Sequence, residues 1–326
     1  MTALADSVAP IAIASRSGLG ESIHHGLAVA IDADGHRTAG VGNPDAVIYP
    51  RSSLKPLQAS AMVDLGLDVP SEMLALACAS HDGAPRHVDG VRGMLAAFDL
   101  DEDDLRNTPA RPYGSAERAE ARAQGTHPSP IQQNCSGKHA AMLATCRVQG
   151  WTTEGYLSPD HPLQQAIMCW IADLVSDSSD PGPGIAHVGV DGCGAPTHAL
   201  RLRDLVAAVA TVVRERRPAA VAMSRHPELV GGPTRDVTLA MQAVSGLVVK
   251  DGAQGVTVAA MPDGRAVALK VADGSDSCRR ALTTTALVHM GVDVPAGLVE
   301  ELRVPVLGIG VPVGEIEPLE WTTCST

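Results

Sequence analysis

Aromatic side chains are scarce in this sequence of 326 residues, which contains three Trp, three Tyr and one Phe. Proteins that bind single-stranded nucleic acid usually stack its bases on such side chains. The formal net charge of -12 would also repel a phosphate backbone, and no cluster of Lys and Arg offsets it locally. We therefore expect no nucleic-acid partner.

Long apolar runs are absent as well. No segment approaches the roughly 18 uninterrupted apolar residues that a membrane span needs, and residues 1–10 lack the basic start and long apolar stretch of a secretory leader. The seven cysteines are odd in number and widely spaced, unlike a secreted disulfide framework. These features predict a cytoplasmic protein without membrane contact, whose cysteines are reduced and mostly buried.

Small apolar residues are abundant instead. With 45% hydrophobic and 19% charged residues, the chain can bury a sizeable core and has none of the composition of a disordered protein. Because aromatic residues are few, this core must be built from Ala, Val and Leu. Length alone permits either one large domain or two smaller ones.

Alternating apolar residues predict strands near both ends of the chain. Turn signals at Asp34-Gly35 and Pro262-Asp263-Gly264 join some of them into hairpins. The predicted strands are 9–15, 26–32, 36–42, 46–50, 246–250, 255–261 and 266–271. A further apolar run at 185–191 predicts a buried strand that ends at Asp191.

Helical periodicity dominates the middle of the chain and returns before the C-terminal tail. The predicted helices are 54–65, 86–98, 138–149, 161–175, 198–216, 236–243, 276–290 and 296–303. The simplest architecture is a single α/β domain, residues 1–326. Its antiparallel sheet comes from about 9–50 and 245–326, and a helical subdomain is inserted at about 51–244.

Ser52 and Lys55 stand at the predicted junction between a strand and the next helix, in the segment RSSLKP. A spacing of three places both side chains on one face of a helical turn. A serine hydroxyl needs a base to take its proton, and a lysine is such a base only if its pKa falls by about 3 units from ~10.4. Burial and a nearby cation such as Arg51 would lower it. Taken alone, the pattern more often marks a capping serine and a solvated lysine.

The same junction predicts how the helix starts. Pro56 falls in the first turn, where its missing N–H has no partner to lose. Ser52 or Ser53 is then expected to cap the helix.

Two further segments could contribute to the same site. Ser80 lies in CASHDG, a segment of small residues that ends in a turn. Lys270 lies in the predicted strand AVALKV, where it shares a face with Ala266 and Ala268, which would let a substrate approach closely. A serine in a turn and a lysine on a solvated sheet face are the ordinary alternatives.

Cysteines accompany polar residues at two other places. Cys135, Lys138 and His139 project from the expected first turn of a helix in NCSGKHAAML, and Cys193 follows Asp191 in DGCG. A soft cation such as zinc could bind Cys135, Cys193 and one nitrogen ligand. The spacing is not that of a zinc finger, so buried reduced cysteines are the alternative.

Five segments in this order resemble the thermolabile, rhizobial-type L-asparaginase family over nearly the whole chain. They are RSSLKP, CASHDG, NCSGKHAAML, DGCGAPTHAL and MSRHPELVGG. The resemblance implies a fold similar to serine β-lactamases and bacterial glutaminases. It also implies an enzyme that hydrolyses L-asparagine to L-aspartate and ammonia, and that forms a homodimer.

The resemblance also assigns roles to residues. Ser52 corresponds to the nucleophile and Lys55 to its partner, while Ser80 forms a second pair with Lys270, for which Lys250 in VVKDGAQG is a competitor. It further implies a zinc ion bound by two cysteines and a lysine, and residues that contact substrate. These residues are Cys135, Lys138 and Cys193 for zinc, and Arg51, His139 and Asp191 for substrate.

Two other functional hypotheses remain open from the sequence. A glutaminase or a penicillin-recognising enzyme would share the Ser-x-x-Lys pattern. A zinc-containing binding protein without catalysis would keep the same residues but release no ammonia.

Overall fold

The computed structural model describes residues 4–176 and 184–324. The chain divides into two compact units. Unit 1 comprises Met1–Ser53, Ala199–Glu215 and Leu239–Thr326, and unit 2 comprises Leu54–His198 and Arg216–Thr238. Unit 1 joins the two ends of the chain, as the strand pattern predicts. Residues 199–215, which we expected in the helical insert, belong to unit 1.

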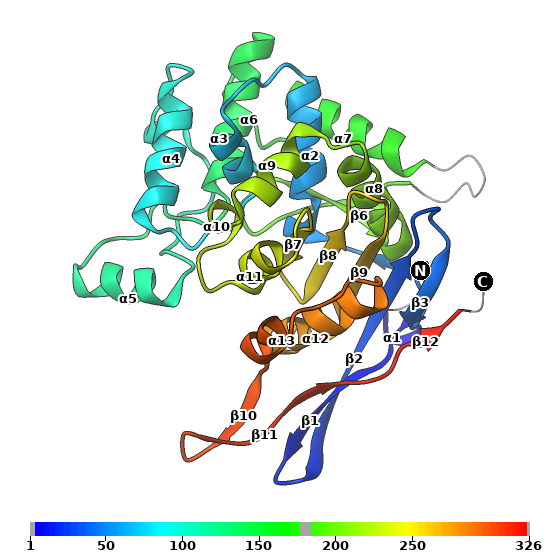
Figure 1. The fold of residues 1–326 in the computed structure, drawn as a ribbon. Helices are drawn as coiled ribbons and strands as arrows, with labels where there is room; N and C mark the ends of the chain where they lie inside the picture. Colours follow the sequence, from blue (N-terminus) through cyan, green and yellow to red (C-terminus); the bar gives the residue numbers. More distant parts are fainter. Residues whose placement is uncertain (1–3, 177–183, 325–326) are drawn as a thin grey trace. The chain divides into compact units, whose positions relative to one another are not determined.

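The core of unit 1 is a nine-stranded antiparallel sheet (Figure 1). Seven strands follow in the order β10-β11-β1-β2-β9-β8-β7, while β3 pairs with β2 and with β12. Their bounds are β1 (Ala9–Arg16), β2 (Leu19–Ile31), β3 (Arg37–Val41), β7 (Val248–Gly252), β8 (Val256–Ala260), β9 (Ala266–Val271), β10 (Pro305–Gly308), β11 (Val311–Pro318) and β12 (Thr322–Thr323). The mixed α/β class and the sheet built from both chain ends are thereby confirmed.

The C-terminal tail contributes three strands that the sequence pattern did not predict. β11 pairs with β1, with Ile13 opposite Glu317, and β10 pairs with β11. Pro and Gly interrupt the alternation of apolar residues in this tail, so its strands cannot be predicted from that alternation. β1, β2 and β11 extend together past the helices of unit 1 (Figure 1).

Helices of unit 1 pack against the middle of this sheet. The helix α8 (Leu202–Arg214) contacts β2, β8 and β9, and α12 (Asp276–His289) contacts β9 and β11. All six residues of β9 are buried. Since alternate side chains of a strand point to opposite faces, the sheet is covered on both faces there. The remaining helices that include unit 1 residues are α1 (Leu4–Ser7), α11 (Asp236–Ala243) and α13 (Ala296–Leu302).

Three short strands lie outside this sheet: β4 (Val47–Ile48), β5 (His187–Val190) and β6 (Pro196–Arg201). Within unit 1, β4 pairs with the second half of β6. The expected helix over 198–216 is therefore wrong at its start, because residues 196–201 are a strand buried on both faces and α8 begins at Leu202.

The expectation for β5 is correct in place but wrong in burial. Both of its ends are exposed, and Val190 is 78% accessible. An apolar run shows that burial is possible, not that it occurs.

Unit 2 is helical. The 3-10 turn η1 (Arg51–Leu54) lies at its boundary, and a second 3-10 turn, η2 (Glu102–Asp104), lies within it. Its helices are α2 (Lys55–Asp64), α3 (Ser71–Ala77), α4 (Pro85–Ala96), α5 (Ser115–Ala123), α6 (Ser136–Gln149), α7 (Pro162–Val175), α9 (Pro218–Arg225) and α10 (Pro227–Val230). The helix α6 is central and contacts α2, α3, α4 and α7. A Cβ on Gly137 would lie 2.2 Å from the carbonyl oxygen of Leu76. Glycine is thus required where the first turn of α6 meets α3.

The composition also led to predictions about membrane contact and about the cysteines. No helix among residues 4–176 and 184–324 is long and apolar enough to cross a membrane. All seven cysteines are free thiols, and five of them are buried.

Candidate active site

The turn that contains Ser52 is a strained element. Arg51 has a φ of 56°, a left-handed conformation that costs a non-glycine residue about 1–3 kcal/mol. The 3-10 turn Arg51–Leu54 then leads directly into α2, with Pro56 in its first turn as predicted. The expected serine cap is wrong, because the cap of α2 is Leu54 without any side-chain bond. The 3-10 turn tightens this helix start, and the Oγ of Ser53 donates instead to the carbonyl of Lys250 at 3.3 Å.

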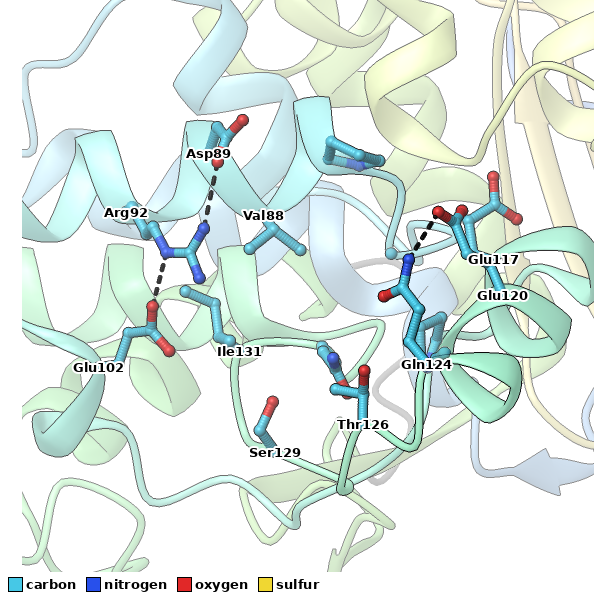
Figure 2. A pocket seen from close by; sticks show the side chains of 15 residues that line it. Val88, Asp89, Arg92, Glu102, Glu117, Glu120, Gln124, Thr126, Ser129 and Ile131 are labelled. Carbon is cyan, nitrogen blue, oxygen red and sulfur yellow. Dashed lines mark hydrogen bonds and ion pairs between the residues drawn. The ribbon is translucent and has the colours of Figure 1, made fainter.

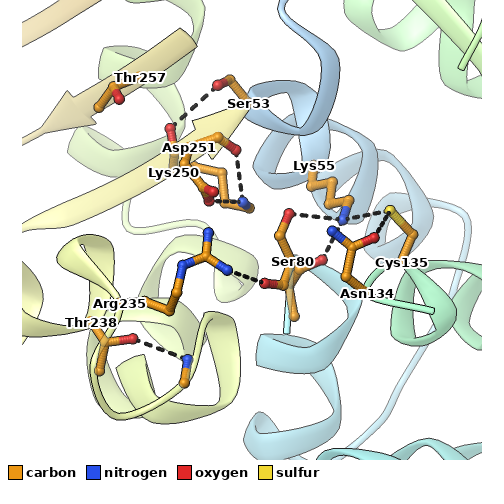
Figure 3. Close-up of polar contacts among 12 residues, drawn as sticks. Ser53, Lys55, Ser80, Asn134, Cys135, Arg235, Thr238, Lys250, Asp251 and Thr257 are labelled. Carbon is orange, nitrogen blue, oxygen red and sulfur yellow. Dashed lines mark hydrogen bonds and ion pairs between the residues drawn. The ribbon is translucent and has the colours of Figure 1, made fainter. Parts of the chain in front are cut away.

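Lys55 is the centre of a polar cluster in unit 2 (Figure 3). Its side chain is fully buried and donates to the Oγ of Ser80 at 3.2 Å and to the Sγ of Cys135 at 3.1 Å. A third hydrogen bond reaches the carbonyl oxygen of Ala79. An ammonium has three N–H groups, so these three acceptors account for all of them. The fold therefore brings together Lys55, Ser80 and Cys135 from three separate segments.

The loop that carries Ser80 is held on both sides by backbone hydrogen bonds. The Ser80 N–H donates to the carbonyl of Val230 at 2.8 Å, and the His81 N–H donates to that of Asn134 at 3.1 Å. The His81 ring is also hydrogen-bonded to the Oγ of Ser136 at 2.9 Å. Ser80 thus occupies a fixed position beside the first turn of α6.

Cys135, Lys138 and Cys193 meet in unit 2. The Nζ of Lys138 donates to the Sγ of Cys193 at 3.2 Å. The two thiols are hydrogen-bonded to each other, and this bond is the main cause that lowers the pKa of Cys193 to about 5 and raises that of Cys135 to about 12. Burial opposes the ammonium of Lys138, but the charges of Cys193, Cys135 and Asp191 outweigh it and raise its pKa above the usual range.

This donor set suits a zinc ion. Two sulfur atoms and one amine nitrogen lie together in a buried place, and zinc prefers sulfur and nitrogen ligands. The Oδ2 of Asp191 lies 4.0 Å from the Sγ of Cys193. The nearby His139 bonds the hydroxyl of Tyr156 at 2.9 Å through Nδ1. Its Nε2 is buried and has no hydrogen-bond partner among the described residues.

Burial also sets the charge state of His139. Its pKa lies well below the usual value because of burial first and the Lys138 charge second. The imidazole is therefore neutral at physiological pH, which is the form that donates one hydrogen bond and accepts another.

Within unit 1, Lys250 is the lysine beside the serine turn. It is fully buried, its Nζ lies 2.5 Å from the Oδ1 of Asp251, and its carbonyl accepts from Ser53 (Figure 3). A Cβ on Gly252 would lie 2.3 Å from the carbonyl of Pro50. The strand β7 therefore runs directly against the turn that carries Ser52.

Lys270 lies elsewhere in unit 1, on β9. Its Nζ donates to the carbonyls of Gln254 at 2.5 Å and Val271 at 2.6 Å. Burial lowers the pKa of this lysine, and the charge of Asp273 opposes that effect.

A compositional signal identifies the same residues. The sequence contains four lysines and 21 arginines, and every lysine is a candidate site residue. Lys55, Lys138, Lys250 and Lys270 are at most 7% exposed. Lysine is otherwise almost never buried without a partner. The rarity of lysine in the sequence could therefore have directed attention to all four.

A separate groove of about 430 Å³ lies in unit 2 (Figure 2). Its floor is partly apolar, and Arg92 is neutralised there by Asp89 and Glu102. Glu117 and Glu120 add negative charge at its other end. None of the site residues predicted from the sequence lines this groove, and its carboxylates would repel the α-carboxylate of an amino acid.

A buried lysine that contacts a serine hydroxyl is a combination typical of enzymes that transfer acyl groups. Residues 12–318 match the family described as L-asparaginase II. The chain belongs to this family, which makes it an amidohydrolase and confirms the resemblance read from its motifs. No curated protein matches the sequence.

Three solved structures are similar to the chain. The first is a beta-lactamase from Mycobacterium bovis, with 15% identity, a TM-score of 0.46, and 82% of this chain and 95% of that chain covered. The second is a Bacteroides dorei protein assigned as a beta-lactamase, with 13% identity, a TM-score of 0.41, and coverages of 81% and 93%. The third is simvastatin synthase from Aspergillus terreus, with 12% identity, a TM-score of 0.37, and coverages of 82% and 90%.

Proposed function

We propose that this amidohydrolase hydrolyses L-asparagine to L-aspartate and ammonia through a serine nucleophile and an acyl-enzyme. The observation that supports this most directly is the fully buried Lys55, whose Nζ lies 3.2 Å from the Oγ of Ser80. In the sequence, Lys55 follows Ser52 by three residues. A lysine that is buried in this way has either a catalytic or a structural role, and the L-asparaginase II family of the chain favours the catalytic role.

The reaction proceeds in two stages, acylation and hydrolysis. The Oγ of Ser52 attacks the side-chain amide carbon of asparagine, and its proton passes to the Nζ of Lys55, which must be the neutral amine for this step. The tetrahedral intermediate then collapses, the C–N bond breaks, and the leaving nitrogen takes this proton from Lys55 to depart as ammonia. Water next attacks the ester and gives one proton to the neutral Lys55, which returns it to the Oγ of Ser52 as aspartate is released. Ser80, hydrogen-bonded to Lys55, relays the proton between that lysine and the leaving nitrogen.

The second lysine of the site is Lys250 rather than Lys270. Lys250 lies on the strand that runs against the Ser52 turn, and the hydroxyl of Ser53 is bonded to its carbonyl. The amines of both lysines donate to oxygen atoms of unit 1, that of Lys270 to two backbone carbonyls and that of Lys250 to the carbonyl and carboxylate of Asp251, so the position of β7 carries the assignment. Loss of activity in Lys250→Met with retention in Lys270→Met would support this assignment, and the reverse result would restore Lys270.

Zinc is the metal that Cys135, Lys138 and Cys193 would hold, and Arg51, His139 and Asp191 contact the substrate. Bound zinc supplies a fixed positive charge that can orient the carboxylate of an amino acid. The amine of Lys138 must lose its proton to become a ligand, and a cation promotes that loss.

The decisive experiment compares ammonia release from asparagine and from glutamine, together with hydrolysis of a chromogenic β-lactam. Turnover of asparagine above the other two is expected. Glutamine as the better substrate would make the protein a glutaminase, and binding of asparagine without ammonia release would make it a binding protein. Ser52→Ala and Ser80→Ala, followed by mass spectrometry of trapped intermediates, identify which serine carries the acyl group.

The resemblance of the sequence motifs to rhizobial-type L-asparaginases supports a homodimer. Large apolar side chains are exposed where β1, β2, β10 and β11 extend, and a second copy would cover them; they are Leu19, Ile23, Leu307, Ile309 and Val311. Light scattering should give twice the monomer mass for the parent protein and a lower mass for Ile309→Asp.

The seven free cysteines further support the cytoplasm as the compartment, because thiols persist in reducing surroundings.

A further inference from the structure

Arg235 occupies a place in unit 2 that no motif assigned. It lies between α10 and α11, and its Nη1 donates to the carbonyl oxygen of Ser80 at 3.4 Å and to the Oδ1 of Asp82 at 3.3 Å (Figure 3). Its guanidinium carbon lies 4.6 Å from the ring centre of Tyr113. An ion pair, a backbone contact and an aromatic face thus hold one guanidinium group.

This ion pair is largely withdrawn from water. The Asp82 side chain is 5% exposed and that of Arg235 is 13% exposed. A Cβ on Gly232 would lie 1.8 Å from the Oδ2 of Asp82, so the carboxylate rests directly on the backbone of the loop that leads to Arg235. The two charges therefore have little freedom to move.

Two cations hold consecutive carbonyl groups of the Ser80 loop. The Nζ of Lys55 donates to the carbonyl of Ala79, and Arg235 donates to the carbonyl of Ser80. Together with the backbone bond from Ser80 to Val230, these contacts hold the backbone from which the Ser80 side chain projects. That hydroxyl is the acceptor for Lys55.

We propose that Arg235 is a positioning residue, which holds the Ser80 carbonyl so that the Ser80 hydroxyl stays in hydrogen-bond reach of Lys55. The inference rests on the proposed function, because a proton relay through Ser80 gives the position its importance. Arg235 acts through Ser80 and does not itself transfer a proton. A planar guanidinium suits this task, since its Nη1 can donate to the Ser80 carbonyl and to Asp82 while its flat face stacks on the Tyr113 ring, which a lysine amine cannot do.

The first test is Arg235→Ala, assayed for ammonia release from asparagine. A displacement of about 1 Å in a proton-transfer site can cost roughly 100-fold in rate, so kcat should fall by about 10- to 100-fold while KM changes little. Guanidinium ions at a non-denaturing concentration should restore part of kcat in Arg235→Ala and none in Ser80→Ala. A purely structural role would not give this rescue at an unchanged melting temperature.

Unit 2 offers a matched control in Arg217. It also forms an ion pair, with Asp64, and its guanidinium carbon lies 5.6 Å from the ring centre of Trp170, but it makes no contact with Ser80. Arg217→Ala should keep the parent kcat and should not respond to guanidinium. An equal loss in both variants would overturn the inference.

A second variant covers the case in which Arg235→Ala does not fold, because it leaves Asp82 buried and unpaired. Asp82→Asn combined with Arg235→Met removes both charges and keeps the volume, which such pairs often tolerate. Low kcat in this folded double variant supports positioning, and parent-like kcat overturns it. If the parent protein itself releases no ammonia, the proposed function fails; if the parent is active and Arg235→Ala is equally active, only this inference fails.

Discussion

The Nζ of Lys55 and the Oγ of Ser80 lie 3.2 Å apart in unit 2, and both side chains are shielded from solvent. Sequence spacing connects Lys55 with Ser52, three residues before it. The fold adds Ser80, which lies 25 residues further along the chain. The fold thus brings a hydroxyl group from a distant segment to this amine, which is why we propose Ser80 as a proton carrier.

Replacing Lys55 by Met should abolish most of the activity. The substitution keeps the volume of the side chain but removes the base and its three hydrogen bonds. Loss of a general base typically costs 10²–10⁴-fold in rate, so kcat for ammonia release should fall by about that factor. Circular dichroism should still show a folded protein.

Glu117→Gln is a suitable control for that experiment, because Glu117 lines the separate groove of unit 2. It should retain the parent kcat. Parent-like turnover in Lys55→Met would remove Lys55 as the base and with it the present mechanism.

Chemical modification tests the burial of the lysines. Because none of the four is more than 7% exposed, an amine-directed reagent should leave all four lysines of the native protein unmodified. After denaturation, mass spectrometry should find all four lysines modified. Rapid modification of Lys55 in the native state would show a solvated amine, contrary to its position here.

Apolar runs that end in turn signals were the strongest guide to the fold. The strand predicted over 26–32 is the buried half of β2, whereas the exposed half that begins at Leu19 was missed because its residues are largely polar. Helix periods gave α2, α4, α6, α7 and α12 to within about two residues. The strand β6 was missed because its six residues are buried on both faces and follow directly into an amphipathic helix, so that no change of period separates the two.

Spacing alone predicted the site only where its residues are close in sequence, and the distant Ser80 and Cys193 came from the family resemblance. Ser52 with Lys55, and Cys135 with Lys138, stand close enough along the chain for spacing to pair them. The contacts of Lys55 with Ser80 and of Arg235 with Asp82 join segments that no periodicity connects. Side-chain capping was also misjudged, because α2 follows directly on the 3-10 turn Arg51–Leu54 and Leu54 stands at its cap position.

Metal analysis tests the zinc site. Protein purified without added metal should contain zinc, and Cys193→Ala should lose it because one of two sulfur ligands is gone. Cys278→Ala provides the control, since Cys278 is a buried free thiol in unit 1. It should retain the metal content of the parent.

Zinc binding should also weaken in acid, because thiols and amine must release protons to bind. If the parent protein is folded and active without metal, the zinc site is refuted, and Cys135 and Cys193 are ordinary buried cysteines.

Acid should destabilise the protein through a stacked pair of imidazoles. The rings of His81 and His87 lie 5.1 Å apart at 25°, and each Nδ1 is buried without a hydrogen-bond partner among the described residues. Burial is the main cause that lowers the pKa of His87 below 6.5 and that of His81 well below it. Both are therefore neutral when folded and protonate more readily when unfolded.

At pH values below 6.5 and above the lowered pKa values of these two histidines, the unfolded chain therefore binds more protons than the folded protein. The free energy of unfolding should be constant with respect to this pair above pH 6.5 and should fall as the pH drops below it. Urea titrations at several pH values measure the slope. His87→Asn should flatten it, whereas replacement of the exposed His127 should leave it unchanged; an identical slope in both variants would assign the acid sensitivity to other groups.

Gly252→Ala should displace the Ser52 turn. A Cβ at Gly252 would meet the carbonyl oxygen of Pro50 at 2.3 Å and the Oγ of Ser53 at 2.9 Å, so one of the two segments must move. Overpacking of this kind costs about 1–3 kcal/mol of stability, and the shifted turn should lower kcat for ammonia release by more than stability alone explains. The control is Gly297→Ala in α13, where a Cβ meets nothing within 4 Å and alanine should stabilise the helix by roughly 0.5–1 kcal/mol. Thermal unfolding and turnover measured on both variants separate the effects, and full activity in Gly252→Ala would show that β7 does not set the position of Ser52.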